Sequence, residues 1–351
     1  MLLYIHIPFC DSKCYYCAFN SYVDKFHLKQ EYMQALLIQL NYELERYKVT
    51  KNSIETLFIG GGTPSTIPPE LYKDIFETLY PYLQKDAEIT TEANPNSATK
   101  EWLNGMFEIG VNRVSFGVQS FDEKKLKLLN RAHTPQMALT ALENAKNIGY
   151  KNISLDLIYA TYGDTKELLQ NDIKLALASP INHLSAYALT IEENTPFEKK
   201  PQMSSEDLKL TTWLFDTIGS YGFKQYEISN FGSYQSKHNK GYWLYKDYIG
   251  LGAGAVGKLD KKRYYPDTII ENYIKNPLNR RVEELSDEDI KIERLFLGFR
   301  SIIGVRKDIL TPIELKNANI LVAEAKLTLK NGIYINQDFL LADELALFIS
   351  S

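Results

Sequence analysis

All three cysteines of the chain lie near its start, at Cys10, Cys14 and Cys17, in a C-x3-C-x2-C spacing. An odd number of thiols cannot all pair in disulfides, and a group on one short loop suits a metal better than a disulfide scaffold. Zinc usually takes four ligands and a ferredoxin-type cluster four cysteines, but the chain has neither a fourth cysteine nor an H-x3-5-H pair. Three thiolates can instead hold three irons of a 4Fe-4S cluster and leave the fourth iron open to a chelating small molecule. Structural zinc, an electron-transfer cluster and inert buried thiols are the alternatives.

Glycines and polar side chains follow several short apolar runs further along the chain. Residues 60–64 read Gly-Gly-Gly-Thr-Pro, which is either a tight connection or a turn whose backbone N–H groups face a ligand. Four polar residues stand at or after the ends of later apolar runs: Glu92, Gln119, Arg131 and Asp156. Each of them alone could be a helix cap or a loop residue. As ligand-binding residues, the carboxylates could accept hydrogen bonds from ribose hydroxyls, and Arg131 could bind a carboxylate of the ligand. Their order along the chain favours one site on a common rim.

A third group, His238-Asn239-x-x-Tyr242-Trp243, lies in the last third of the chain. Imidazole is a common axial ligand of haem iron, and flanking aromatic rings can stack on a porphyrin face. In a chain with 24 tyrosines, ordinary packing is the better explanation of the same residues taken alone.

These groups need a scaffold, and the first two-thirds of the chain alternates β-branched apolar runs with amphipathic segments. The pattern predicts strands at residues 2–7, 56–60, 88–92, 113–118, 152–157 and 183–189. It predicts helices at residues 25–47, 70–84, 100–109, 124–130, 135–148 and 166–178. The fold class is therefore α/β, a partial (β/α)6 barrel whose site forms at the carboxyl ends of parallel strands.

The rhythm changes after about residue 200. A helix at 205–221 precedes an aromatic segment and the glycine-rich run YIGLGAGAVGKL, and from residue 286 we expect helices with a short strand at 332–335. We predict two domains: residues 1–230 with the cluster site, and residues 231–351, smaller and mainly helical, with the histidine motif at its start.

Composition excludes several classes of protein. The 40 Lys and Arg nearly balance the 44 Asp and Glu, and the net charge of −4 gives no general attraction to nucleic acid or anionic lipid. The 44% hydrophobic and 24% charged residues are ordinary for a globular chain. No apolar stretch reaches the roughly 20 residues that span a bilayer, and no basic amphipathic helix stands out. We expect a cytoplasmic protein with reduced thiols, no nucleic-acid partner and at most peripheral membrane association.

The segments YIHIPFCDSKCYYC, FIGGGTP, ITTEANP, RVSFGVQSF, NRAH and LDLIY resemble the HemN/HemW branch of the radical SAM (S-adenosylmethionine) superfamily. The resemblance runs from the first residues to about residue 260. It implies a 4Fe-4S cluster on the three cysteines, with SAM on the open iron. Contacts to that SAM are implied for Tyr4, Tyr16, Gly61 and Glu92. Contacts to a second SAM are implied for Gly62, Thr63, Gln119, Arg131, Asp156 and Ala188.

Two features separate the types within this branch. Phe19 stands where the coproporphyrinogen dehydrogenase HemN carries a fourth cysteine, and the HNxxYW motif resembles the haem-binding motif of HemW. The resemblance therefore implies haem binding by His238, Asn239, Tyr242 and Trp243. One departure is DLIYATYGDT, where the family has Gly-Leu-Pro beside the aspartate.

The favoured function is a HemW-like haem chaperone that passes haem to apo-haemoproteins such as respiratory cytochromes, with homodimerisation expected and no residue given a catalytic role. Whether the chain is also an enzyme stays open. One alternative is an oxygen-independent coproporphyrinogen III oxidase that uses a 5′-deoxyadenosyl radical. Another is SAM chemistry on a different substrate, with incidental haem binding.

Overall fold

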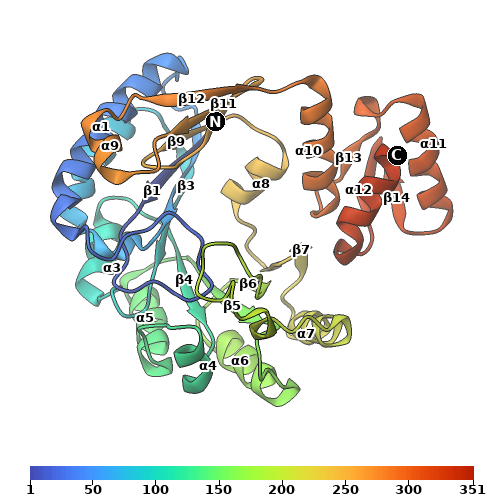
Figure 1. Cartoon of the computed structure of the whole chain (residues 1–351), viewed down its shortest axis with the longest axis horizontal. Helices are drawn as coiled ribbons and strands as arrows, with labels where there is room; N and C mark the ends of the chain where they lie inside the picture. The colour runs from blue at the N-terminus through green and yellow to red at the C-terminus, as the bar shows by residue number, and fades with distance from the viewer.

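The computed structural model describes all 351 residues. Its core is a curved sheet in which six consecutive parallel strands lie side by side in chain order (Figure 1). These are β1 (Leu2–Ile7), β2 (Ile54–Gly61), β3 (Leu83–Ala93), β4 (Arg113–Gln119), β5 (Asn152–Tyr159) and β6 (His183–Ala188). The predicted α/β class and partial (β/α)6 barrel are confirmed.

Helices between these strands cover the outer face of the sheet (Figure 1). They are α1 (Lys29–Arg46), α2 (Lys73–Leu79), α3 (Lys100–Glu108), α4 (Glu123–Leu128), α5 (Pro135–Ile148) and α6 (Lys166–Ala178). Thr99, Asp122, Thr134 and Thr165 cap the last four, each accepting a backbone N–H with its side chain. The predicted helix at 70–84 is too long, because α2 ends at Leu79 and residue 83 already pairs with β2.

The sheet grows at both edges beyond the six predicted strands. On one side β9 (Tyr248–Leu251) pairs parallel to β1 and is followed by antiparallel β10 (Gly257–Leu259), β11 (Lys262–Pro266) and β12 (Arg280–Glu284). On the other side β8 (Asn230–Gly232) and β7 (Gln225–Glu227) follow β6. The glycine-rich run thus forms a hairpin, in which a Cβ on Gly250 would lie 2.1 Å from the carbonyl oxygen of Val256.

Three further helices belong to this part of the molecule: α7 (Leu208–Ser220), α8 (Lys237–Trp243) and α9 (Ile270–Lys275). Helices α7 and α9 lie outside the sheet, whereas α8 lies on its concave side and packs on β2 (Figure 1). The histidine motif is therefore carried into the barrel interior.

The last residues form a separate small layer. Helices α10 (Asp287–Phe299), α11 (Pro312–Ala323) and α12 (Ala342–Ser350) surround a sheet of β13 (Val305–Arg306), β15 (Ile333–Asn336) and β14 (Leu327–Lys330). Their apolar core runs from Leu295 to Ile349 and is distinct from the barrel core. The large sheet crosses residue 230, where we predicted a domain boundary, and that boundary stays a prediction. None of the helices is long and apolar enough to cross a membrane.

Candidate functional site

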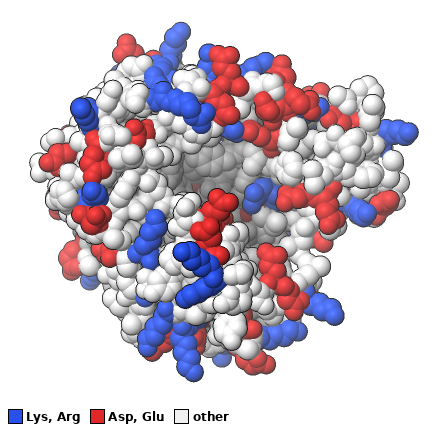
Figure 2. Space-filling view, in the orientation of Figure 1, with Lys and Arg blue, Asp and Glu red and all other residues white.

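Two cavities lie side by side on the concave side of the sheet, where the space-filling view shows a hollow (Figure 2). The cysteine cavity, about 630 Å³, is lined by the three cysteines and by strand ends of the barrel. The aromatic cavity, about 830 Å³, lies between α8, β9–β11 and α10. Ala18 and Phe19 line both, so the cysteine loop is their common wall.

The structure brings most of the predicted cluster and SAM residues together. The cysteine cavity is lined by Cys10, Cys14, Cys17, Tyr16, Gly61, Gly62, Thr63, Glu92, Gln119, Arg131, Asp156 and Ala188. Most of these residues come from the loop after β1 and from the carboxyl-terminal parts of β2 to β6, as parallel strands require. Arg131 differs, because it lies in the connection between α4 and α5. Tyr4 is the exception, because its side chain lines the aromatic cavity.

The cysteine loop is held by backbone bonds at both ends. The Cys10 N–H donates to the Tyr22 carbonyl at 3.0 Å, and the Cys17 N–H donates to the Cys14 carbonyl at 3.2 Å. Burial raises the pKa of the Cys10 and Cys17 thiols. No three Cys, His, Asp or Glu side chains converge on a point where one metal ion would sit. A 4Fe-4S cluster has no such requirement, because each thiolate binds a different iron, so three thiols lining one cavity fit it.

Glycines after β2 let the strand end press against this loop. A Cβ on Gly62 would lie 2.9 Å from the carbonyl oxygens of Ile7 and Phe9 and 3.0 Å from the Cys10 Sγ. Gly61 has a φ of +112°, which favours glycine, and a Cβ there would lie 2.5 Å from the His6 ring. The Gly61 N–H donates to Glu92 Oε2 at 3.1 Å. The glycine turn is therefore a close approach between two walls of the cavity.

Two carboxyl groups face the same cavity. Desolvation, and then the nearby charge of Asp156, raise the pKa of Glu92 to about 7. Desolvation likewise raises the pKa of Asp156 to about 6. Hydroxyl or ammonium groups of a ligand would supply the donors that two desolvated carboxylates need.

Arg131 holds several walls of the cysteine cavity. Its Nη1 donates to the Cys14 Sγ at 3.1 Å, and its Nη2 donates to Asn94 Oδ1 at 2.7 Å. Its buried Nε has no hydrogen-bond partner, and such a donor fits an anionic ligand group such as a carboxylate. Gln119, at the end of β4, has a φ of +68°, a strained conformation of the kind found at ligand sites.

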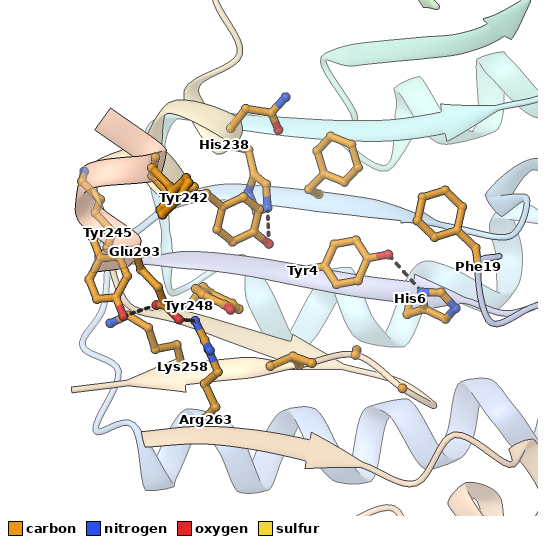
Figure 3. A pocket seen from close by; sticks show the side chains of 18 of the residues that line it. Tyr4, His6, Phe19, His238, Tyr242, Tyr245, Tyr248, Lys258, Arg263 and Glu293 are labelled. Carbon is orange, nitrogen blue, oxygen red and sulfur yellow. Dashed lines mark hydrogen bonds and ion pairs between the residues drawn. The ribbon is translucent and has the colours of Figure 1, made fainter. Parts of the chain in front are cut away.

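His238 lies in the wall of the aromatic cavity (Figure 3). Its Nδ1 is 2.7 Å from Thr56 Oγ1, its Nε2 is 3.0 Å from the Tyr242 hydroxyl, and its ring stacks on Phe58 at 5.1 Å. Burial, and then the charge of Arg113, lower the pKa of His238 to about 3. The imidazole is therefore neutral near pH 7, which is the form that binds metals.

The other motif residues divide between two places. Asn239 and Tyr242 line the aromatic cavity with His238, whereas Trp243 lies outside it and packs on Tyr226 at 5.7 Å. Tyr4 also stacks on Phe58, with ring centroids 6.2 Å apart, and its hydroxyl is 3.0 Å from His6 Nδ1 (Figure 3).

Sequence reasoning missed several residues that line the cavities. Asn94 joins Thr63 to Arg131, and the TEANP run held the signal for it. Tyr245, Arg263 and Glu293 line the aromatic cavity, but they come from segments where neither spacing nor resemblance gave a signal.

Comparison with known proteins gives three findings. Residues 4–176 match the family model of the radical SAM superfamily. The chain is 34% identical over 321 residues to the haem chaperone HemW of Bacillus subtilis, and this match covers 87% of this chain and 84% of that protein. It is 39% identical over 267 residues to HemW of Escherichia coli, and this match covers 73% of this chain and 70% of that protein. Its fold is similar to that of coproporphyrinogen III oxidase (HemN) from Escherichia coli, with a TM-score of 0.82 at 18% identity over 100% of this chain and 90% of that one.

Proposed function

Since this chain belongs to the HemW family within the radical SAM superfamily, we propose that it binds haem in the aromatic cavity and passes it to other proteins. The observation that supports this best is the setting of His238. Its neutral imidazole lies in the wall of an 830 Å³ cavity, which is large enough for a cofactor-sized ligand.

The hydrogen bonds of His238 suit an axial ligand. A metal-binding histidine usually donates its second ring N–H to a partner that fixes the tautomer, and Thr56 Oγ1 can accept from Nδ1. Nε2 then carries a lone pair that accepts the Tyr242 O–H. Iron would take this lone pair in place of the hydroxyl proton, so Tyr242 has to turn away. Phe58, Tyr4 and Tyr248 supply aromatic surface for the porphyrin faces.

The cysteine cavity would hold a 4Fe-4S cluster on Cys10, Cys14 and Cys17, with SAM on the open iron. When bound, this pair supplies one-electron chemistry. The chain's own residues bind and orient SAM: Arg131 offers its free Nε–H to a carboxylate, and Glu92 and Asp156 accept from hydroxyl or amino groups. As the cavity is separate from the aromatic one, we propose that the cluster has a regulatory or structural role, in dimerisation and haem transfer, and is not needed for haem binding itself.

The test is a hemin titration of the purified holoprotein under anaerobic conditions, followed by the Soret band. We expect His238→Gln to lose the Soret position of the wild type and to weaken binding by at least about tenfold. The control is His183→Gln, because His183 is also buried and bonded at both ring nitrogens but lies outside both cavities. Wild-type binding in His238→Gln would reject this ligand.

Partners and location are further parts of the proposal. We propose that the acceptors are apo-haemoproteins such as respiratory cytochromes, that the chain works in the cytoplasm, and that it forms a homodimer. Haem transfer is tested by mixing the haem-loaded protein with an apo-cytochrome and separating the two proteins. A haem that stays on the donor would contradict the chaperone role.

A second candidate function, oxidation of coproporphyrinogen III, is favoured by one observation. The two cavities share Ala18 and Phe19, so a tetrapyrrole in the aromatic cavity would lie beside the cysteine cavity. An anaerobic assay with coproporphyrinogen III, SAM and a reductant tests it. Formation of protoporphyrinogen IX would establish this activity, and its absence from a protein with a full cluster would exclude it.

A further inference from the structure

One row of paired residues across the sheet connects Thr56, which binds His238, with Arg263, which lines the aromatic cavity. Thr56 of β2 is paired with Leu2 of β1, Leu2 with Tyr248 of β9, Tyr248 with Lys258 of β10, and Lys258 with Arg263 of β11. Four strand spacings of about 4.8 Å therefore lie between Thr56 and Arg263, which is about 19 Å measured along the curved sheet. As Thr56 binds His238, the imidazole and Arg263 lie at the two ends of this row, and both line the aromatic cavity (Figure 3).

A carboxylate already binds at the Arg263 end. Arg263 Nη2 donates to Glu293 Oε1 at 2.5 Å, and the Tyr245 hydroxyl donates to Glu293 Oε2 at 2.5 Å, so both carboxylate oxygens are engaged (Figure 3). All three side chains line the cavity. Burial, and then the bond to Glu293, raise the pKa of Tyr245, so its hydroxyl remains a donor. Arginine with a neutral phenol is a donor set for a carboxylate.

The other two cations of the cavity have partners elsewhere. Lys246 binds Glu55 at 2.5 Å and Lys258 binds Asp247 at 2.6 Å, and neither acidic residue lines the cavity. Glu293 differs because it faces the cavity and comes from α10, in the C-terminal layer. Arg263 is therefore the cation of this cavity whose carboxylate partner, Glu293, also lines the cavity. A ligand carboxylate that binds Arg263 would have to replace Glu293.

We propose that Arg263 and Tyr245 bind a propionate carboxylate of the tetrapyrrole, and that Glu293 competes for this position. The inference rests on the proposed haem binding and adds which ligand group is recognised. In a porphyrin the iron lies at the centre and the propionates at one edge, so a metal ligand and an anion site must lie apart in one cavity. His238 and Arg263 both line the aromatic cavity and are attached to different strands of the same row. Propionate binding releases Glu293 and with it one link between β11 and α10.

The test compares hemin with hemin dimethyl ester, in which both propionates are esterified, on the wild type, Arg263→Gln and Glu293→Gln. We expect Arg263→Gln to weaken hemin binding roughly tenfold and to leave binding of the ester unchanged, because only a charged carboxylate uses the guanidinium. We expect Glu293→Gln to tighten hemin binding several-fold, a result that a folding defect cannot produce. Arg281→Gln is the control, because Arg281 lies over Tyr265 and outside the cavity.

The outcomes separate the inference from the proposed function. A wild type that binds neither hemin nor its ester rejects both. A wild type that binds hemin, with Arg263→Gln and Glu293→Gln binding it equally well, leaves haem binding intact and rejects the carboxylate site. If Arg263→Gln binds hemin and its ester equally less well than the wild type does, the Arg263–Glu293 pair is only a structural link. This result also rejects the carboxylate site.

Discussion

The cysteine cavity and the aromatic cavity share a wall but are assembled differently. The first is made of one loop and the ends of parallel strands that follow one another in the chain. The second joins β1 and β2 to α8, β9–β11 and α10, which lie some 180 to 290 residues later. Its histidine is fixed by Thr56, 182 residues away. A site built by successive βα units can be recognised in sequence, whereas one built by distant segments shows only its motif.

The largest effect should separate the two cavities. In Cys14→Ser we expect complete loss of the cluster after anaerobic reconstitution, because one iron loses its thiolate, while hemin binding changes less than about twofold. Iron and sulfide analysis and a hemin titration on the same sample measure this. Ser12→Ala is the control, as Ser12 lines the same cavity without a thiol. If Cys14→Ser also loses hemin binding, the two cavities are not independent.

The next effect concerns the carboxyl pair of the cysteine cavity. The pKa of Glu92 is raised to about 7, so the stability it contributes is present below about pH 4.5 and is lost as the pH rises through 7. Glu92→Gln should therefore be more stable than the wild type at pH 8 by about 3 kcal/mol, with almost no gain at pH 4.5. Urea unfolding of the apo-protein at both values measures this, and exposed Glu70→Gln is the control. A gain of the same size at both pH values would contradict the assignment.

The two cavities also differ in how much of each could be predicted from the sequence. The six strands and the cysteine loop were predicted because each depends on a local pattern, and the rule that parallel strands end at one edge placed polar residues near that loop. The contacts of these residues with SAM came from the family resemblance. The extra strands β9 to β12 were missed because the glycines of 248–259 hide the hairpin of β9 and β10. Of these two strands, β9 pairs with β1, far away in sequence. Arg263 and Glu293 were missed because they come together only through a contact between β11 and α10, which no local sequence pattern indicates.

A smaller effect is expected for Tyr242, the residue of the histidine motif whose hydroxyl is bonded to His238. We expect Tyr242→Phe to tighten hemin binding roughly fivefold, because the hydroxyl that occupies His238 Nε2 is removed while the ring remains. Trp243→Phe is the matched variant, and its hemin affinity should stay within about twofold because Trp243 packs on Tyr226 outside the cavity. The same titration measures both. Weaker binding in Tyr242→Phe would mean that the hydroxyl helps the ligand instead of competing with it.

The smallest effect tests the shared wall. Phe19 is 67% exposed and lines both cavities. We expect Phe19→Ala to keep a full cluster and to weaken hemin binding by only about two- to threefold, as a porphyrin edge loses part of one aromatic contact. Val23→Ala, an exposed apolar residue of the same loop outside both cavities, should change neither. Hemin affinity is also compared between the cluster-free and the cluster-loaded forms of each protein. If these forms differ tenfold or more in Phe19→Ala but not in the wild type, the Phe19 ring separates the two sites. It would then be the contact that keeps two differently built cavities independent.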